Sequence, residues 1–261
     1  MAIDSPIVIV SDIHLQDAGD EKSRLLLEVI EKIDPATVEY FVLLGDIFDF
    51  CLGSSSYFRR KFGYLGESLS RLADKGVKVV FVEGNHEFDL AALQWPNVKF
   101  ITDQYHTITL KSGLKIGLCH GDLLAPDSKY LTFRSFVKSK FMTDLSSYVP
   151  GMLLDFYALN HARISRNRTR NMELCHDRVV KGVMEWSEKH DVDFYIFGHF
   201  HIPYAEKIPN GKKMLSVNSW DKPNILAVSK EGSAQRCYLS LTENSYRFES
   251  IFGDTRGCPL F

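Results

Sequence analysis

Mostly apolar runs alternate with amphipathic stretches through the first third of the chain. The runs Ile7–Val10, Tyr40–Leu44 and Val77–Val82 predict largely buried strands. Leu25–Ile33 and Leu65–Leu72 carry apolar residues at the three- and four-residue spacing of amphipathic helices. An alternation of buried strands and amphipathic helices is typical of an α/β protein whose sheet is covered on both faces.

A second pattern, of short strands joined by turns, begins near Val98 and returns in the last part of the chain. Turns are expected at Lys111–Gly113, Asn210–Gly211 and Glu231–Gly232, each of which contains a glycine after a polar residue. The strands expected on this basis are Val98–Ile101, His106–Leu110, Lys115–Cys119, Phe194–Phe197, Lys213–Val217, Ile225–Val228, Arg236–Leu241 and Tyr246–Ile251.

The middle of the chain differs in charge and periodicity. Residues 129–170 hold eight basic and two acidic side chains, a formal charge of +6, whereas the whole chain carries −2. They also hold many aromatic and aliphatic side chains at helical spacing. One interpretation is a helical insertion whose apolar side is ordinary core. The other is a basic, apolar lid over a site for an anionic, partly apolar ligand. We expect residues 1–125 and 171–261 to form the core and 126–170 the insertion.

Composition narrows the class of protein. The 261 residues are 45% hydrophobic and 25% charged, as in ordinary globular proteins, and a net charge of −2 gives no general attraction to nucleic acid. No apolar stretch approaches the roughly 20 residues of a membrane span, and we expect no signal peptide. The five cysteines lack a CxxC pair and indicate packed, reduced thiols in the cytoplasm. They are Cys51, Cys119, Cys175, Cys237 and Cys258.

Residues able to carry chemistry follow directly after five of the predicted strands. Because the carboxyl ends of parallel strands form the ligand-binding edge of α/β sheets, we expect these segments to converge. Their oxygen and imidazole donors, without any thiolate, suit Mn²⁺, Fe²⁺ or Zn²⁺ better than a structural zinc site. The segments are Ser11–His14, Gly45–Asp49, Glu83–Glu87, His120–Asp122 and Gly198–His201.

Spacing within these segments supports a shared site. Asp12 and His14 are two residues apart, as are His199 and His201, so in extended backbone both side chains of each pair point the same way. Glycines in the segments are expected to let the backbone turn tightly and approach a metal or phosphate. These glycines are Gly45, Gly84, Gly121 and Gly198.

Taken in order from Asp12 to His201, the motifs D-x-H, G-D-x-x-D, G-N-H-[DE], H-G-D and G-H-x-H resemble those of the calcineurin-like metallophosphoesterases. The resemblance implies a four-layer α/β/β/α sandwich, with the helical insertion as a cap, and a site for two divalent metal ions. It assigns one metal to Asp12, His14, Asp46 and His201, and the other to Asp46, Asn85, His120 and His199, with Asp46 bridging.

The same resemblance implies roles for residues at and beside the ligands. Asp46 and Asn85 are expected to take part in catalysis through the metals. His86 is expected to contact the phosphate or to donate a proton to the leaving oxygen. Asp49 and Glu87 are interpreted as carboxylates that orient ligand histidines. The histidines outside the motifs, expected to be surface or structural residues, are His106, His161, His176 and His190.

Within that superfamily the chain is similar to the UDP-2,3-diacylglucosamine hydrolases of lipid A biosynthesis. Shared features are S-D-I-H-L, G-D-I-F-D, and H-G-D followed by Asp127 and Tyr130, then a basic helical insertion and G-H-F-H. The resemblance implies a cap whose apolar surface takes acyl chains, with Asp127 and cap arginines contacting the substrate. His86 stands where the best-known members carry Arg. The cap arginines are Arg163, Arg166, Arg168 and Arg170.

The sequence thus predicts a cytoplasmic, dinuclear-metal hydrolase that cleaves UDP-2,3-diacylglucosamine to UMP and 2,3-diacylglucosamine 1-phosphate. The alternative is a metallophosphodiesterase acting on another nucleotide or diphosphate substrate. Mn²⁺ is the first choice of metal, with Fe²⁺ and Zn²⁺ as alternatives. The expected partners are a nucleotide-diphosphate lipid and, through the amphipathic cap, the cytoplasmic face of the inner membrane. No nucleic acid is expected.

Overall fold

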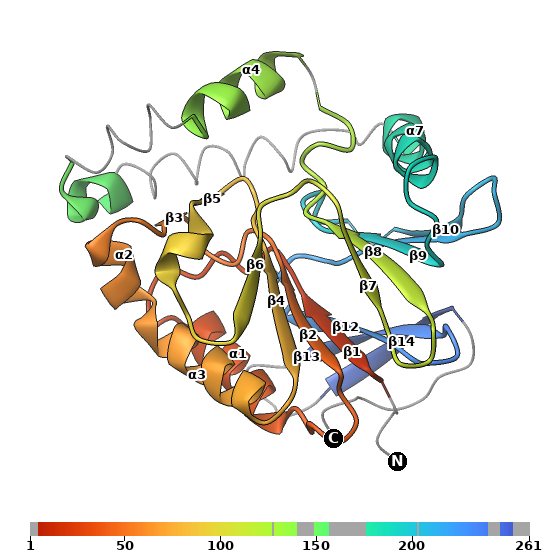
Figure 1. Cartoon of the computed structure of the whole chain (residues 1–261), viewed down its shortest axis with the longest axis horizontal. Coiled ribbons are helices and arrows are strands. Elements are labelled where there is room, and N and C mark those ends of the chain that lie inside the picture. The colour runs from red at the N-terminus through yellow and green to blue at the C-terminus, as the bar shows by residue number, and fades with distance from the viewer. Residues whose placement is uncertain are drawn as a thin grey trace.

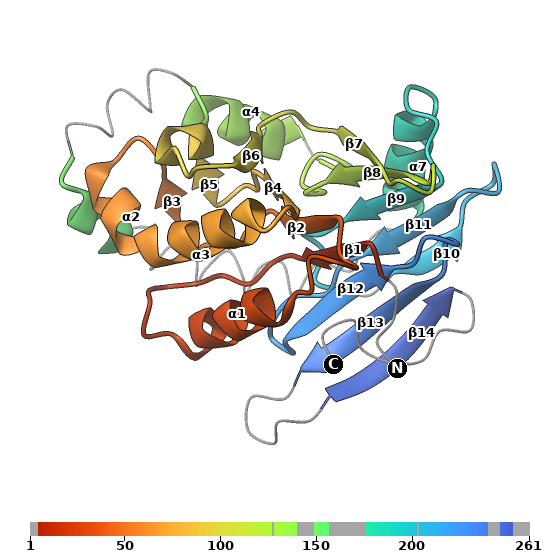
Figure 2. The same cartoon turned by 60° about the horizontal axis from the view of Figure 1, so that its bottom comes forward.

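The computed structural model describes residues 5–126, 128–139, 149–156, 176–202, 204–239 and 246–252. Two β-sheets form its centre (Figures 1 and 2). The larger has the strand order β14 (Tyr246–Phe252), β13 (Ala234–Leu239), β12 (Asn224–Val228), β1 (Ile7–Val10), β2 (Tyr40–Leu44), β4 (Lys78–Val82), β6 (Val98–Ile101). The smaller has the order β10 (Ala205–Lys207), β11 (Lys213–Ser216), β9 (Phe194–Phe197), β8 (Lys115–Cys119), β7 (His106–Thr109). A short separate sheet pairs β3 (Cys51–Leu52) with β5 (Glu87–Phe88).

Helices lie on the outer faces of both sheets. α1 (Glu21–Lys32) and α3 (Gly63–Asp74) cover the seven-stranded sheet, and α7 (His176–Ser187) covers the five-stranded sheet (Figure 1). The remaining helices with printed bounds are α2 (Ser56–Lys61), the short 3₁₀ helix η1 (Leu90–Leu93) and α4 (Ser128–Val137). A further helix spans 151–156.

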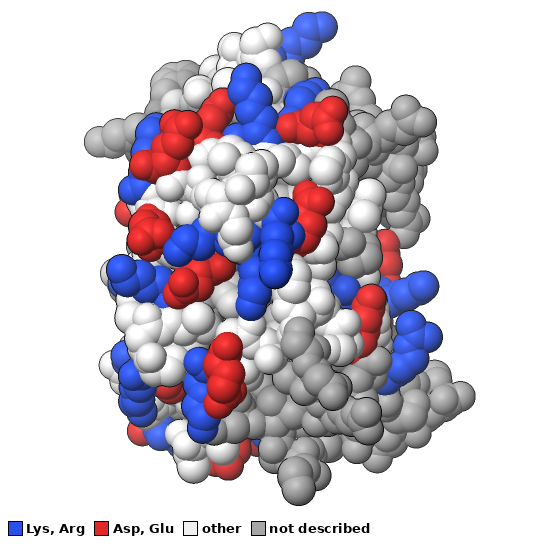
Figure 3. All heavy atoms as spheres, turned by 90° about the vertical axis from the view of Figure 1, so that its right-hand side faces the viewer, with Lys and Arg blue, Asp and Glu red and all other residues white. Residues whose placement is uncertain are grey.

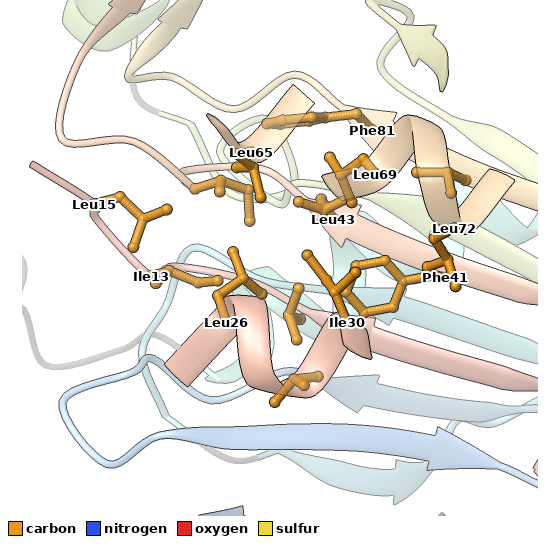
Figure 4. Close-up of a cluster of buried hydrophobic side chains, with 14 of the residues drawn as sticks. Ile13, Leu15, Leu26, Ile30, Phe41, Leu43, Leu65, Leu69, Leu72 and Phe81 are labelled. Atoms are coloured by element: carbon orange, nitrogen blue, oxygen red, sulfur yellow. The ribbon is translucent and has the colours of Figure 1, made fainter. Parts of the chain in front are cut away.

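Three apolar clusters separate the layers. One lies between α1, α3 and the seven-stranded sheet and includes Leu43 of β2 (Figure 4). A second lies between the two sheets and includes Val42 of β2 and Ile196 of β9. The third lies under α7 and includes Trp186. The layers are therefore helix, sheet, sheet and helix, which confirms the predicted α/β/β/α sandwich.

Burial on two faces explains the continuous apolar runs of the central strands. In β2, Phe41 and Leu43 belong to the cluster under the helices, whereas Val42 and Leu44 belong to the cluster between the sheets. Successive side chains of a strand point to opposite faces, so a strand covered on both sides needs apolar residues at every position.

The first helix begins earlier than its apolar periodicity indicates, because Asp20 caps it. The Asp20 carboxylate accepts a hydrogen bond from the Lys22 N–H at 3.0 Å. That N–H belongs to the first turn, whose N–H groups have no acceptor within the helix. Leu26 and Ile30 then lie on the buried face, pointing toward Leu43 (Figure 4).

Most predicted strands agree with the structure, with small differences at their ends: β7 stops at Thr109 and β13 begins at Ala234. The short elements β3, β5, β10, α2 and η1 are not predicted from the sequence, and neither is α7. That helix turns Val179, Val183 and Trp186 toward the five-stranded sheet. Their spacing is visible in the sequence, so periodicity alone is enough to find α7.

Part of the predicted insertion falls within the described residues, as α4 and the helix at 151–156. Apolar side chains of this part are exposed, which favours a lid over ordinary core for them. They are Leu131, Phe136, Val149, Met152, Leu153 and Phe156. The division of the chain at residues 126 and 170 stays a prediction.

The cysteines that the structure describes are free and buried, as expected of thiols packed as small apolar groups: Cys51, Cys119 and Cys237. Cys175 and Cys258 lie outside the described residues. Among the described helices, none has the length and apolar character needed to cross a membrane.

Adjacent leucines of α1 test the packing of the first layer. Leu26 is fully buried and Leu27 is half-buried. We expect Leu26→Ala to lower the free energy of unfolding by about 2–5 kcal/mol, because it deletes buried methyl groups and leaves a cavity. Leu27→Ala should cost clearly less. Urea denaturation of both variants measures the difference, and equal losses would contradict this orientation of α1.

Candidate metal centre

The polar segments that follow β1, β2, β8 and β9 are joined to one another by hydrogen bonds. The Asp12 N–H donates to the Gly45 carbonyl oxygen at 3.1 Å, and the Gly198 N–H donates to the His120 carbonyl oxygen at 2.8 Å. The His199 N–H donates to the Asp12 carboxylate, 3.0 Å from Oδ2. Because Asp12 and His199 follow strands of different sheets, the site spans the junction between the sheets.

Acidic and imidazole side chains form three groups, and within each group the donor atoms lie within 4.8 Å of one another. The groups are Asp12–His14–His201, His14–Asp46–His86 and Asp46–His120–His199. The first and third groups correspond to the two expected metal sites. The first lacks the expected Asp46, and the third lacks the expected amide ligand Asn85. His14 and Asp46 each belong to two groups, so the three form one continuous cluster.

Asn85 lies against the third group. Its Oδ1 is 3.0 Å from His120 Nε2, which is in turn 3.4 Å from Asp46 Oδ2. The other ring nitrogen, His120 Nδ1, lies 3.1 Å from the Leu44 carbonyl oxygen. Since a carbonyl oxygen only accepts, this contact holds a proton on Nδ1 and turns Nε2 toward Asp46 and Asn85 as the atom available to a metal.

His14 provides the test of whether these residues fit a metal. Both of its ring nitrogens are buried without a hydrogen-bond partner among the described residues. The Asp49 Oδ1 atom is 3.6 Å from Nδ1, beyond hydrogen-bonding distance. A buried, unpaired polar atom costs roughly 1–3 kcal/mol, and a cation bound by a ring nitrogen removes that cost. The donor set therefore fits divalent metal ions.

The backbone at the cluster is held in an uncommon conformation. The residues with φ between 50° and 70° include five of the expected metal ligands: Asp12, His14, Asp46, His199 and His201. This left-handed region is unfavourable for side chains other than glycine, at a cost of order 1 kcal/mol or more per residue. Such strain persists only where the surrounding structure imposes it, and it gathers at functional sites.

The left-handed backbone corrects the expectation of extended D-x-H and H-x-H segments. Asp12 and His14 do share a donor group, as expected. His199 and His201, by contrast, belong to different groups. All four residues have positive φ, so the alternation of an extended strand applies to neither pair, and the shared group of Asp12 and His14 does not come from extended backbone.

Neighbouring charges set the protonation of the cluster. Burial alone would raise the pKa of Asp46, but the surrounding imidazoles, His120 above all, hold it well below the ordinary value. Burial lowers the pKa of His14 to about 3 and that of His199 to about 4, so both rings are neutral at pH 7, the form that binds metal. Burial opposes protonation of His120 as well, yet the Asp46 carboxylate raises its pKa to about 10.

His86 lies at the rim of the cluster. Its Nδ1 is 2.8 Å from the Asp49 carbonyl oxygen, and its Nε2 is 3.9 Å from Asp46 Oδ2. The side chain is 13% exposed, whereas that of His120 is 1% exposed. The structure therefore adds His86 to a candidate donor group with His14 and leaves it partly accessible, as is His201 with 17% exposure, which is compatible with contact to a ligand.

Two glycines leave room for donor side chains. A Cβ atom on Gly84 would lie 2.3 Å from Asp46 Oδ1, and one on Gly198 would lie 2.6 Å from Asp12 Oδ2. Both distances are far below van der Waals contact, so no side chain fits at either position. The groups that come close to these glycines are the Asp46 carboxylate at Gly84 and the Ser11 hydroxyl and Asp12 carboxylate at Gly198; the expected approach of a metal or phosphate stays a prediction.

The expectation that Glu87 orients a ligand histidine is wrong. Its buried carboxylate accepts four backbone N–H groups, from Gly84 (2.7 Å), Asp46 (3.1 Å), Ile47 (2.7 Å) and Phe48 (3.2 Å). Burial and the Asp46 carboxylate raise the pKa of Glu87, whereas the four backbone N–H groups favour its charged form. Glu87 thus holds the segment after β2 against the segment after β4.

Asp49 lies beside His14 and His86, which it approaches through different atoms. Its Oδ1 is 3.6 Å from His14 Nδ1, its Oδ2 accepts a hydrogen bond from Gln16 Nε2 at 3.0 Å, and its carbonyl oxygen faces His86 Nδ1. The carboxylate itself is too far from His14 for a hydrogen bond and the contact to His86 is made by the backbone, so its expected role in orienting the ligand histidines stays a prediction.

The expected substrate contacts are not covered by the structure. Asp127, Arg163, Arg166, Arg168 and Arg170 lie outside the described residues, as does His161. The other histidines outside the motifs do not belong to the donor groups; they are His106, His176 and His190. Of these, His176 is on the surface, where it pairs with Glu206 at 2.8 Å.

Sequence reasoning missed the supporting role of β11 and the segment after it. The Trp220 N–H donates to the Asp12 carbonyl oxygen at 3.1 Å. The buried Ser216 hydroxyl accepts from the Tyr204 N–H at 2.6 Å and donates to the Ile202 carbonyl oxygen. These contacts brace the segments after β1 and β9. No motif marks these residues in the sequence. Their only distinguishing feature is their place in the fold, because β11 runs parallel to β9 and ends beside it.

Comparisons with known proteins find similar chains. The family model described as calcineurin-like phosphoesterase matches residues 5–203. A UDP-2,3-diacylglucosamine hydrolase from Neisseria meningitidis is 31% identical over 235 residues, covering 87% of this chain and 96% of the relative. One from Haemophilus ducreyi is 27% identical over 233 residues, covering 85% and 96%. Among solved structures, a dimetal phosphatase from Danio rerio matches with a TM-score of 0.46 and 15% identity, covering 94% of this chain and 98% of that chain.

Glu87→Gln tests the hold of Glu87 on the backbone. The variant keeps the shape but replaces one accepting oxygen by an NH₂ group that faces N–H donors. We expect its affinity for Mn²⁺ to fall by about 10–100-fold, because the donors of the cluster lose their fixed positions. Calorimetric titration of metal-free protein measures it. Glu28→Gln, on the exposed face of α1, is the control; equal affinities in the two variants would contradict this role.

Proposed function

Because this chain belongs to the calcineurin-like phosphoesterase family, we propose that it cleaves UDP-2,3-diacylglucosamine to UMP and 2,3-diacylglucosamine 1-phosphate, a step of lipid A biosynthesis. The chain is a hydrolase, and its family implies divalent metal ions, for which the structure offers candidate donor groups. The observation that carries the proposal is the buried donor cluster beside an insertion with exposed apolar side chains. The substrate follows the names of relatives that the chain matches over 96% of their length.

We assign two metal ions to the cluster. Asp12, His14, Asp46 and His201 would hold one, and Asp46, Asn85, His120 and His199 would hold the other. Two cations there would polarise a phosphoryl group and increase the acidity of water. Asp46 would be the ligand shared by both ions, because it belongs to two of the donor groups and its carboxylate has two oxygens. Mn²⁺ is our first choice, and Fe²⁺ and Zn²⁺ accept the same donors.

The residues of the chain then position the phosphoryl group and move a proton. The Asp49 carbonyl oxygen, 2.8 Å from His86 Nδ1, holds one imidazole proton away from the cluster. A protonated His86 therefore directs its second proton, on Nε2, toward the site. We propose that this N–H first donates a hydrogen bond to a phosphate oxygen. As general acid, it then transfers its proton to the leaving oxygen.

Exposed side chains in the insertion support a lipid substrate. Phe136, Met152, Leu153 and Phe156 are between 56% and 70% exposed. Phe136 lies on α4, whereas Met152, Leu153 and Phe156 lie on the helix at 151–156, and exposed apolar side chains that gather on a surface mark a binding site. Acyl chains fit it by their chemistry, and the basic character of residues 129–170 fits a diphosphate. We propose that Asp127, Arg166 and Arg168 contact the polar part of the substrate.

His86 favours a second candidate, hydrolysis of another nucleotide or diphosphate. It stands where the best-known members of the diacylglucosamine hydrolases carry Arg. An imidazole is shorter than a guanidinium and cannot form a bidentate fork with phosphate oxygens. A substrate with a different arrangement around its phosphates would suit this change.

We propose a cytoplasmic location with reversible contact at the cytoplasmic face of the inner membrane. The exposed apolar side chains of the insertion and the charge of +6 on residues 129–170 are the combination that binds an anionic bilayer surface. We propose no nucleic acid partner. On the face shown in Figure 3, basic and acidic side chains are interspersed, whereas nucleic acid binding needs a broad basic surface.

The substrate assignment predicts release of UMP. Purified protein with Mn²⁺ should cleave UDP-2,3-diacylglucosamine, and Asp46→Asn should reduce the rate by at least about 100-fold, because an amide does not replace a carboxylate shared by two cations. Chromatography of UMP measures the reaction. Bis(4-nitrophenyl) phosphate, a small diester, serves as the parallel substrate for the metal chemistry alone.

Each outcome of that assay decides one part of the proposal. Cleavage of the small diester without UMP release would exclude the lipid substrate and keep the metal chemistry. Full activity of Asp46→Asn on both substrates would contradict the assigned ligands.

Membrane contact is tested on the exposed side chains of the insertion. Phe136→Ser, Met152→Ser and Phe156→Ser combined should weaken co-sedimentation with phosphatidylglycerol–phosphatidylethanolamine vesicles by about tenfold or more, because apolar area no longer enters the bilayer surface. Ile202→Ser is the matched control, since Ile202 is 43% exposed but lies outside the insertion. Equal binding by the triple variant and the wild type would exclude this surface.

A further inference from the structure

The helix α4 is tied to the segment after β8 by a partly buried ion pair. Arg134 Nε lies 2.6 Å from Asp122 Oδ2, and the Tyr130 hydroxyl donates to the same oxygen at 2.7 Å. The Asp122 side chain is 5% exposed and that of Arg134 is 23% exposed. Asp122 comes two residues after His120, so this contact joins α4 to a segment that carries a donor of the cluster.

A second ion pair joins the end of α4 to the segment after β4. Lys138 Nζ lies 2.7 Å from Glu83 Oε1 and donates to the Gly84 carbonyl oxygen at 2.7 Å. The ammonium also lies 5.4 Å from the ring centre of Phe88. Gly84 directly precedes Asn85, the amide that faces His120. The same helix is therefore in contact with the segments of two donors of the cluster.

The spacing of Arg134 and Lys138 along the chain places both ion pairs on the same face of α4. Arg134 and Lys138 are four residues apart, and the Lys138 N–H still donates to the Arg134 carbonyl oxygen at 2.9 Å. Residues at this spacing share one face of a helix. A helix held at two points on one face cannot turn about its axis without breaking an ion pair, and α4 keeps Leu131 and Phe136 exposed.

The helix at 151–156 is anchored in the same way. Asp155 accepts from Lys61 Nζ at 2.6 Å and from the Tyr57 hydroxyl at 2.9 Å, both on α2. The Lys61 and Asp155 side chains are 13% and 10% exposed. Ion pairs with this much burial are screened less by water than surface pairs. The described helices of the insertion thus have fixed positions against the core.

We propose that Arg134 and Lys138 are positioning residues that hold α4 over the segments carrying His120 and Asn85, and so determine the fit of a large substrate without taking part in phosphoester cleavage. The proposal rests on the function proposed above for the lipid substrate. A substrate with acyl chains on the insertion and a phosphate at the cluster must span both parts, so their relative position sets its affinity. A small diester at the cluster alone does not depend on it.

Lys138→Met separates positioning from general stability. We expect KM for UDP-2,3-diacylglucosamine to rise about tenfold, with kcat and the cleavage of bis(4-nitrophenyl) phosphate unchanged. Lys138→Arg, which keeps the charge, should restore most of the affinity. Lys129→Met, an exposed lysine of the same helix, is the matched control. Equal losses on both substrates, or no change in KM, would overturn the proposal.

A second measurement does not depend on the substrate. Amide hydrogen exchange of residues 128–139 should be faster in Lys138→Met than in Lys129→Met, while exchange in β1 and β2 stays the same. Unchanged exchange in α4 would overturn the proposal even if the lipid is cleaved. If wild-type protein releases no UMP, the lipid assignment fails, and the exchange result still decides whether Lys138 holds α4.

Discussion

The carboxylate of Glu87 joins the two backbone segments on which the site depends. It accepts N–H groups from Gly84 on one side and from Asp46, Ile47 and Phe48 on the other. Asp46 belongs to two of the three donor groups, so its position sets the geometry of the whole cluster. Replacing water around a buried carboxylate takes several well-directed N–H donors. The backbone that provides them is thereby fixed, and so are the side chains attached to it.

Rigid surroundings also explain how the site keeps so many residues in the left-handed region. The strands that lead into it are buried on both faces, by helices on one side and by the second sheet on the other. Close packing of this kind resists relaxation of the connecting segments. Gly84 and Gly198 complete the constraint, because the Asp46 carboxylate fills the space of a side chain at Gly84, and the Ser11 hydroxyl and Asp12 carboxylate fill it at Gly198. The close packing that stabilises the sandwich therefore also imposes the strained backbone at its edge.

Much of this could be predicted from the sequence, because apolar runs and polar segments alternate so regularly. The runs Ile7–Val10 and Tyr40–Leu44 are strands as expected, and the polar residues after them do converge. The four-layer α/β/β/α arrangement was predicted from the resemblance of the motifs to those of the calcineurin-like metallophosphoesterases. Glu87 was misassigned because its partners are backbone N–H groups, which leave no mark in a sequence. Extended backbone at His199 and His201 was a wrong inference for a similar reason: long-range packing, and not local preference, imposes their positive φ.

The hydrogen bond between the His199 N–H and the Asp12 carboxylate closes a loop of 187 residues. Contacts between positions so distant in sequence form late, since the chain between them must first lose its conformational freedom. Asp12 emerges early from the ribosome, but His199 and His201 follow only after most of the chain has been made. The full donor set thus exists only once both sheets have packed, so the complete site is a property of the finished fold, whereas the group His14–Asp46–His86 is already contained in the first third of the chain.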